Sequence, residues 1–143
     1  MDMIEVKLIA DNLDVNSVLR RINEKAGAYV LFLGRVRNHD RGTKVHKLVY
    51  EAYLEMAEKE MRRIAEEAIN RFGVLDVFIY HRYGALKVGE ETFLVVVTSS
   101  HRREAFEACS WIVDQVKSRV PIWKVELTDR GAFWVEGNNL KPI

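Results

Sequence analysis

Cysteine, proline and long apolar runs are scarce in this sequence of 143 residues. Its one cysteine, Cys109, excludes a disulfide bond within the chain, and a single thiol does not make a cysteine-based zinc site. No apolar run reaches the roughly 18 residues that a membrane-spanning helix needs. The residues after Met1 also lack the basic and apolar segments of a signal peptide. We therefore expect a cytoplasmic protein that has no membrane partner.

An excess of charge of one sign is also missing, because the net charge is only +1. Bulk charge therefore predicts no nucleic-acid partner. The basic residues are nevertheless concentrated between Gly34 and Lys47, where one acid, Asp40, stands among Arg35, Arg37, Arg41, Lys44 and Lys47. A local basic patch on a nearly neutral protein favours a small anionic ligand. A solvated loop is the alternative, and charge alone leaves it open.

Familiar catalytic and cofactor-binding motifs are absent from the sequence. Neither nucleotide-binding glycine motif occurs, and there is no serine nucleophile of the GxSxG type. The four histidines show no metal-ligand spacing, so we expect neither a metal nor a cofactor. Cys109 falls within the apolar stripe of a predicted helix, which favours a buried structural thiol over a reactive one.

Apolar periodicity predicts an α+β domain in which about three helices pack on a mostly antiparallel sheet. We expect the whole chain, 1–143, to form this one domain, with a mobile-looking loop at 38–43. The predicted helices are 15–25, 54–72 and about 102–117. The predicted strands are 3–9, 28–33, 46–53, 75–83, 92–98, 122–127 and 132–136.

Two lysines on either side of Pro121 form the most informative local pattern. Pro121 must end the helix that arrives from Arg103, so Lys117 lies in its last turn and Lys124 near the start of the next strand. The turn between them can bring both ammonium groups to the opening of one pocket. Neighbouring cations in a partly dry site favour the neutral, nucleophilic form of a lysine. Alternatively, Lys117 only complements the helix dipole and Lys124 is exposed to solvent.

Two further segments have the chemistry of an anion site. Gly34 permits close backbone approach, and Arg35 and Arg37 after it suit a phosphate or carboxylate. His101 and Arg102 stand at the start of the helix that ends near Lys117, where free N–H groups attract anions. Simple capping by a serine is the alternative there. At 1.5 Å per residue the helix separates its two ends by roughly 23 Å, so either the site is long or two subunits complete it.

Five blocks occur in a characteristic order: Phe-Leu-Gly-Arg-Val-Arg-Asn-His at 32–39, Glu-Ala-Tyr at 51–53, His-Arg-Tyr-Gly at 81–84, Thr-Ser-Ser-His-Arg at 98–102 with Ala-Phe-Glu-Ala at 105–108, and Lys-Ser-Arg-Val-Pro-Ile-Trp-Lys at 117–124. Together they resemble the catalytic (large) subunit of molybdopterin synthase. The likeness extends over nearly the whole chain. It implies an α/β hammerhead-like fold with a small extra antiparallel β subdomain.

The resemblance also implies an activity and partners. Members of that family are sulfurtransferases that move two sulfur atoms to cyclic pyranopterin monophosphate, which creates the dithiolene of molybdopterin. The sulfur arrives as a thiocarboxylate on the C-terminal Gly-Gly tail of a small ubiquitin-like subunit. The large subunit forms a homodimer that carries one small subunit at each distal end, a 2+2 heterotetramer. A non-catalytic anion-binding regulatory module is the alternative reading of the same basic residues.

The resemblance assigns roles to individual positions. Lys117 and Lys124 match the catalytic lysines, and Phe32 and Val113 match residues that line the pocket. The positions that match substrate-binding residues are Arg35, Val36, Arg37, His101, Arg102, Lys117, Lys124, Val125 and Glu126. We expect His101 and Arg102 to serve a site completed across subunits, and the tail of the small subunit to enter a tunnel that ends near Lys117.

Overall fold

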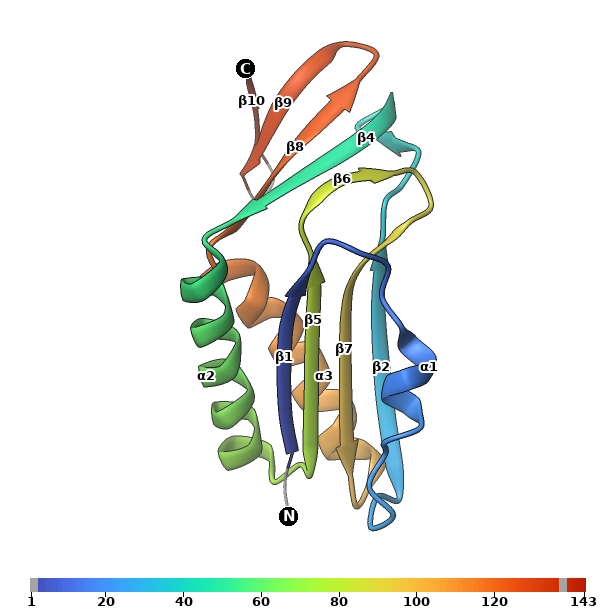
Figure 1. Cartoon of the computed structure of the whole chain (residues 1–143), viewed down its shortest axis with the longest axis vertical. Coiled ribbons are helices and arrows are strands. Elements are labelled where there is room, and N and C mark those ends of the chain that lie inside the picture. The colour runs from blue at the N-terminus through green and yellow to red at the C-terminus, as the bar shows by residue number, and fades with distance from the viewer. Residues whose placement is uncertain (1–2, 137–138) are drawn as a thin grey trace.

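The computed structural model describes residues 3–136 and 139–143, which form three helices and ten strands (Figure 1). The helices are α1 Val15–Leu19, α2 Leu54–Phe72 and α3 Arg102–Arg119. The strands are β1 Met3–Ile9, β2 Ala28–Arg35, β3 His39–Asp40, β4 Thr43–Ala52, β5 Asp76–Arg82, β6 Gly84–Lys87, β7 Glu91–Ser99, β8 Ile122–Thr128, β9 Gly131–Glu136 and β10 Asn139–Pro142. These elements confirm the predicted α+β class.

A four-stranded mixed sheet in the order β1-β5-β7-β2 forms the larger half of the molecule. Its β1–β5 pair is parallel and the other pairs are antiparallel, as the prediction of a mostly antiparallel sheet requires. Successive side chains of β5 point to opposite faces. Val77 and Ile79 pack in the core with α2 and α3, whereas Phe78 and Tyr80 pack with residues of and beside α1. Because both faces of β5 are covered, all seven of its residues are buried.

A second, curled antiparallel sheet lies across one end of the first (Figure 1). Its long strand β4 pairs with β3, β6 and β8, and the order continues through β9 to β10. The chain passes between the sheets several times, from β2 to β3, from β5 to β6, and from α3 to β8. Residues at these crossings therefore lie where the two sheets meet.

Helix α2 agrees with the prediction at both ends. Its apolar stripe is buried except for Phe72, which is partly buried, and Gly73 ends the helix at a positive φ of 69°. The buried members of the stripe are Ala57, Met61, Ile64, Ala65 and Ala68. The periodicity of apolar residues was enough to predict this helix, because one face of a long helix packs against a single core.

Helix α1 is much shorter than the predicted 15–25. Asp14 caps it as expected, because its carboxylate accepts the Ser17 N–H at 3.1 Å. The helix nevertheless ends at Leu19, and Asn23 then binds the following backbone, accepting the Lys25 N–H on its side chain at 2.9 Å. Gly27 is not the helix stop; a Cβ there would lie 2.2 Å from the carbonyl oxygen of Ser100, so close packing requires glycine.

The segment predicted as a loop at 38–43 forms a β-hairpin instead. His39 pairs with Lys44 and Asp40 with Thr43, and the turn has positive φ at Arg41 (50°) and Gly42 (74°). Strands β6 and β10 were also missed, since each has only four residues. Helix α3 continues to Arg119, two residues past its predicted end, and stops before Pro121 as predicted.

Candidate active site

A cavity of about 470 Å³ lies where the two sheets and the C-terminal end of α3 come together. Each neighbouring element contributes one to three side chains, so the site depends on the whole fold. The lining residues are Phe32, Gly34 and Arg35 from β2, Tyr50 from β4, His81 from β5, Thr92 and Phe93 from β7, Val116 and Lys117 from α3, Ile122, Trp123 and Lys124 from β8, and Val135 from β9. A volume of this size suits a small organic ligand.

Both lysines singled out from the sequence line this cavity. The turn at Pro121 brings them together, because α3 ends and β8 starts at Ile122, whose N–H donates to the carbonyl of Val120 at 2.7 Å. Burial lowers the pKa of Lys124; Glu126 opposes this shift, and the charge of Lys117 adds to it. Lys117 is exposed and Lys124 is partly buried, so the two form a pair of neighbouring cations of which Lys124 is displaced toward its neutral form.

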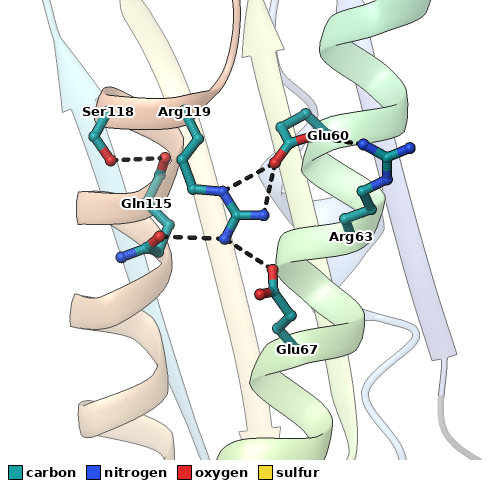
Figure 2. Close-up of polar contacts among 6 residues, drawn as sticks. All are labelled: Glu60, Arg63, Glu67, Gln115, Ser118 and Arg119. Atoms are coloured by element: carbon teal, nitrogen blue, oxygen red, sulfur yellow. Dashed lines mark hydrogen bonds and ion pairs between the residues drawn. The ribbon is translucent and has the colours of Figure 1, made fainter.

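The C-terminal turn of α3, which carries Lys117, is fixed to α2 by Arg119 (Figure 2). The Arg119 guanidinium donates to Glu60 Oε1 from Nε at 2.9 Å and from Nη2 at 2.6 Å. Its Nη1 donates to Gln115 Oε1 at 3.2 Å and pairs with Glu67 Oε2 at 2.8 Å. The hydrogen bond from Arg119 lowers the pKa of Glu60. No local sequence pattern indicates this network, because it joins residues on two separate helices.

The three residues after Gly34 have different surroundings. Arg35 lines the cavity. Val36 is buried among Val45, Leu48 and Leu86, and its backbone bonds to residues of the β6–β7 turn. Arg37 is exposed and lies 3.5 Å from Asp40 at the hairpin. Of the three, the structure therefore brings only the side chain of Arg35 to the cavity wall.

Glu126 is buried close to Lys124, with only 5% of its surface exposed. Burial and a hydrogen bond with Asp40 raise the pKa of Glu126, while the charges of Lys124 and Arg41 oppose the shift. Within residues 3–136 and 139–143, its Oε1 has no hydrogen-bond partner. The neighbouring Val125 is also buried, at 9% exposure. Glu126 is thus a carboxyl group held in a poorly solvated position beside the lysines.

The other predicted site residues are divided between the cavity wall, the core and the far end of α3. Phe32 lines the cavity and packs edge-on against Phe93, with ring centroids 5.5 Å apart. Val113 is partly buried in the core beneath α3. His101 and Arg102 are exposed at the N-terminal end of α3, at the opposite end of the four-stranded sheet from the curled sheet (Figure 1). One protomer therefore does not bring them to the cavity.

Several cavity residues were not recognised as site residues from the sequence, and His81 is the most unusual. Its side chain is 6% exposed, and its Nδ1 lies 2.7 Å from the carbonyl oxygen of Arg82. Burial lowers the pKa of His81 to about 4, and the charges of Lys124 and Lys117 contribute to the shift. The other unrecognised side chains with polar groups are Tyr50, Thr92 and Trp123. The only sequence signal was the presence of His81 within the 81–84 block.

Metal-ligand clusters, membrane-spanning helices and the state of Cys109 can also be examined in the described residues. Over residues 3–136 and 139–143, no group of three or more His, Cys, Asp or Glu side chains is placed to hold a metal ion. No helix in these ranges is both long and apolar enough to cross a bilayer. Cys109 is buried, and burial raises its pKa to about 11, as expected of a structural thiol.

Comparison with known proteins connects this geometry to one family. The family model of the MoaE protein matches residues 8–119. The chain is 59% identical over 121 residues to the molybdopterin synthase catalytic subunit of Pyrococcus abyssi, covering 85% of this chain and 82% of that protein. It is 46% identical over 113 residues to the Escherichia coli catalytic subunit, covering 79% of this chain and 75% of that protein.

Solved structures agree with the sequence comparisons. The crystal structure of molybdopterin synthase from Staphylococcus aureus superposes with a TM-score of 0.85 at 34% identity, covering 90% of this chain and 95% of that one. A complex of subunits 1 and 2 of molybdopterin-converting factor from Helicobacter pylori contains a chain with the same fold, at a TM-score of 0.75 and 24% identity, covering 94% and 92%. The chain therefore belongs to the MoaE family of molybdopterin synthase catalytic subunits, enzymes of molybdenum cofactor biosynthesis.

Proposed function

We propose that this chain transfers two sulfur atoms to cyclic pyranopterin monophosphate and that the transfer takes place in the cavity lined by Lys117 and Lys124. The observation that carries the proposal is the meeting of these lysines in one cavity, which also contains Arg35. An arginine on the wall suits the substrate phosphate. A lysine with a lowered pKa suits proton transfer near neutral pH.

The sulfur donor in this proposal is the thiocarboxylate at the C-terminal Gly-Gly tail of a small ubiquitin-like subunit. Each transfer forms a carbon–sulfur bond at a substrate carbon in place of a carbon–oxygen bond, whose oxygen stays on the phosphate as the cyclic ring opens or leaves as water. It also breaks the acyl carbon–sulfur bond of the carrier. Water adds to that acyl carbon, so the carrier leaves as a carboxylate. Lys117 orients the thiocarboxylate anion, and Lys124 pairs with negative charge that develops on the substrate. No thiol of this chain takes part, which agrees with the burial of Cys109.

The proposal includes an assembly of two copies of this chain and two small subunits. The Helicobacter pylori complex of subunits 1 and 2 supports a small-subunit partner for this fold. Within the homodimer, we assign His101 and Arg102 to the substrate site of the neighbouring copy, because they lie far from the cavity of their own chain. The whole chain acts as one domain, and we place the assembly in the cytoplasm.

The test is a reaction with the thiocarboxylated small subunit and the cyclic pterin, with dithiolene formation as the readout. The Lys117→Ala variant should lose dithiolene formation while it retains the circular dichroism spectrum and melting temperature of the unmodified chain. Lys25→Ala is the matched control, because Lys25 is exposed and does not line the cavity. Unchanged turnover in Lys117→Ala would contradict a catalytic role and favour a non-catalytic anion-binding module.

A further inference from the structure

His81 is held in a single orientation on the cavity wall. Its ring packs edge-on against Tyr50, with centroids 4.9 Å apart at 72°, and lies tilted against Phe93 at 5.1 Å and 31°. Only 6% of the side chain is exposed, although the residue lines the cavity. Packing on two sides therefore fixes where the remaining edge of the ring points.

The hydrogen bonding of His81 also fixes its tautomer. Nδ1 lies 2.7 Å from the carbonyl oxygen of Arg82, and a carbonyl can only accept, so Nδ1 carries the proton. In a neutral imidazole the other nitrogen, Nε2, is then an acceptor. Residues 3–136 and 139–143 provide no hydrogen bond to Nε2. Burial and the nearby lysine charges hold the pKa of this histidine near 4, so the ring is neutral at physiological pH.

The acceptor on His81 contrasts with its polar neighbours in the cavity. Arg35, Lys117 and Lys124 can only donate when charged. The hydroxyl groups of Tyr50 and Thr92 are hydrogen-bonded to each other, and each oxygen keeps a further lone pair that can accept. The site therefore combines three cationic donors with a few neutral acceptors, among which the His81 nitrogen is fixed in direction by the packing of its ring. Such a combination distinguishes a ligand that has both an anionic group and an N–H or O–H donor.

We propose that His81 is a substrate-orienting residue, whose Nε2 accepts a hydrogen bond from an N–H or O–H group of the heterocyclic substrate. The inference rests on the proposed function, because it requires that the substrate occupy this cavity. In this role His81 recognises an N–H or O–H group of the substrate, whereas the arginine and the lysines recognise its negative charge. His81 is too weak a base to take a proton at neutral pH, so its part is orientation.

Three variants separate the acceptor from the shape of the side chain. His81→Gln can place an amide oxygen near the position of Nε2, whereas His81→Asn can retain only the bond to the Arg82 carbonyl. His81→Phe retains the ring and removes both polar atoms. Binding of the cyclic pterin is measured by titration calorimetry on the complex with the small subunit in its carboxylate form, which has no sulfur to transfer. A lost hydrogen bond that leaves a donor unpaired costs about tenfold in affinity.

The expected pattern is about tenfold weaker pterin binding in His81→Asn and His81→Phe, and recovery to within about threefold in His81→Gln. Nitrogen NMR of the unmodified complex provides a readout that does not depend on any variant folding. The Nε2 resonance should be that of an unprotonated acceptor, and it should move when the pterin is added. Equal affinity in all three folded variants, or an Nε2 resonance unchanged at saturating pterin, would overturn the inference.

These results are distinguishable from a failure of the proposed function. Dithiolene formation by the unmodified complex tests sulfur transfer directly. If the unmodified complex turns over normally while Nε2 does not respond to bound pterin, the role of His81 is wrong and the proposed function stands. If the unmodified complex forms no dithiolene, the proposed function is wrong, and the orienting role of His81 falls with it.

Discussion

Two buried carboxyl groups, Asp76 in the four-stranded sheet and Glu126 in the curled sheet, differ in their hydrogen bonding. In the sheet, the Asp76 carboxylate accepts the Thr98 hydroxyl at 2.8 Å and the Met3 N–H at 3.0 Å. The Asp76 N–H donates to the same hydroxyl at 3.0 Å. Glu126 lies close to the cavity residue Lys124, whose pKa is lowered, and has an oxygen with no partner within residues 3–136 and 139–143.

We interpret Asp76, whose hydrogen bonds are complete, as a group that stabilises the fold. We interpret Glu126 and Lys124 as groups whose partner is a ligand. Buried polar groups are nearly always paired, so an unpaired one needs an explanation. Arg82 Nε and Glu104 Oε2 are also unpaired among the described residues, and what distinguishes Glu126 is its position beside Lys124, whose pKa is lowered. The sheet tolerates Asp76 because its hydrogen bonds are complete within the chain. The cavity groups lower stability until a substrate or a partner tail arrives, which is the expected relation at an active site.

The largest expected effect comes from removing a charge at the cavity. Lys124→Met replaces a poorly solvated ammonium group with an apolar side chain of similar length. We expect dithiolene formation to fall by about 10²- to 10³-fold, the range for a lost group that stabilises developing negative charge. The free energy of unfolding, measured by urea titration, should stay the same or rise. A variant that loses stability and activity together would contradict the distinction between the two regions.

The contrast also shows what the sequence could reveal in advance. Helix α2 and strands β5 and β7 follow from apolar periodicity, because each meets a continuous core. The two lysines were found because Pro121 fixes the local geometry of a short turn. By contrast, Tyr50 and His81 reach the cavity through the way the two sheets meet. No local pattern encodes that meeting, so these residues were not recognised.

The predictions of a helix at 15–25 and of a loop at 38–43 were wrong for local reasons. The apolar spacing after Val15 resembled a longer helix, but the side chain of Asn23 binds the backbone and starts a turn. The hairpin depends on two successive residues with positive φ, and only one of them, Gly42, is a glycine. His101 and Arg102 remain assigned to the site by family resemblance and by the proposed dimer.

A smaller effect of the opposite kind is expected in the sheet. Thr98→Val keeps the shape of a completely buried side chain but removes its hydroxyl group. The Asp76 carboxylate then loses a hydrogen-bond donor, and the Asp76 N–H loses its acceptor. The unpaired carboxylate and N–H should lower the free energy of unfolding by about 1–3 kcal/mol. Activity per folded molecule should not change, since Thr98 does not line the cavity. A selective loss of turnover at unchanged stability would show that the two regions are not separable.

A third expected effect is an acid dependence of stability at the outer face of the sheet. Burial alone would raise the pKa of Glu5, but hydrogen bonds with Arg21, Tyr80 and Lys7 outweigh it and lower the pKa to about 2. Because the folded pKa lies below the ordinary 4.5, the unfolded chain binds more protons between these values. The stabilisation is therefore complete above about pH 4.5 and is lost as the pH falls toward 2.

Glu5→Gln checks this acid dependence. The variant should be less stable than the unmodified chain at pH 7, and the difference should shrink as the pH is lowered from 4.5 to 2. Urea unfolding at several pH values measures the difference directly. A difference that does not depend on pH would mean that Glu5 contributes through packing and not through its charge.

A structure of the complex with the small subunit would show whether the cavity with Lys117 and Lys124 receives the tail of that subunit. We expect the C-terminal glycine of the small subunit to enter this cavity, with a terminal oxygen within about 3 Å of the Lys117 ammonium group. A tail that ends on another surface, with the cavity closed to it, would rule out sulfur transfer at these lysines.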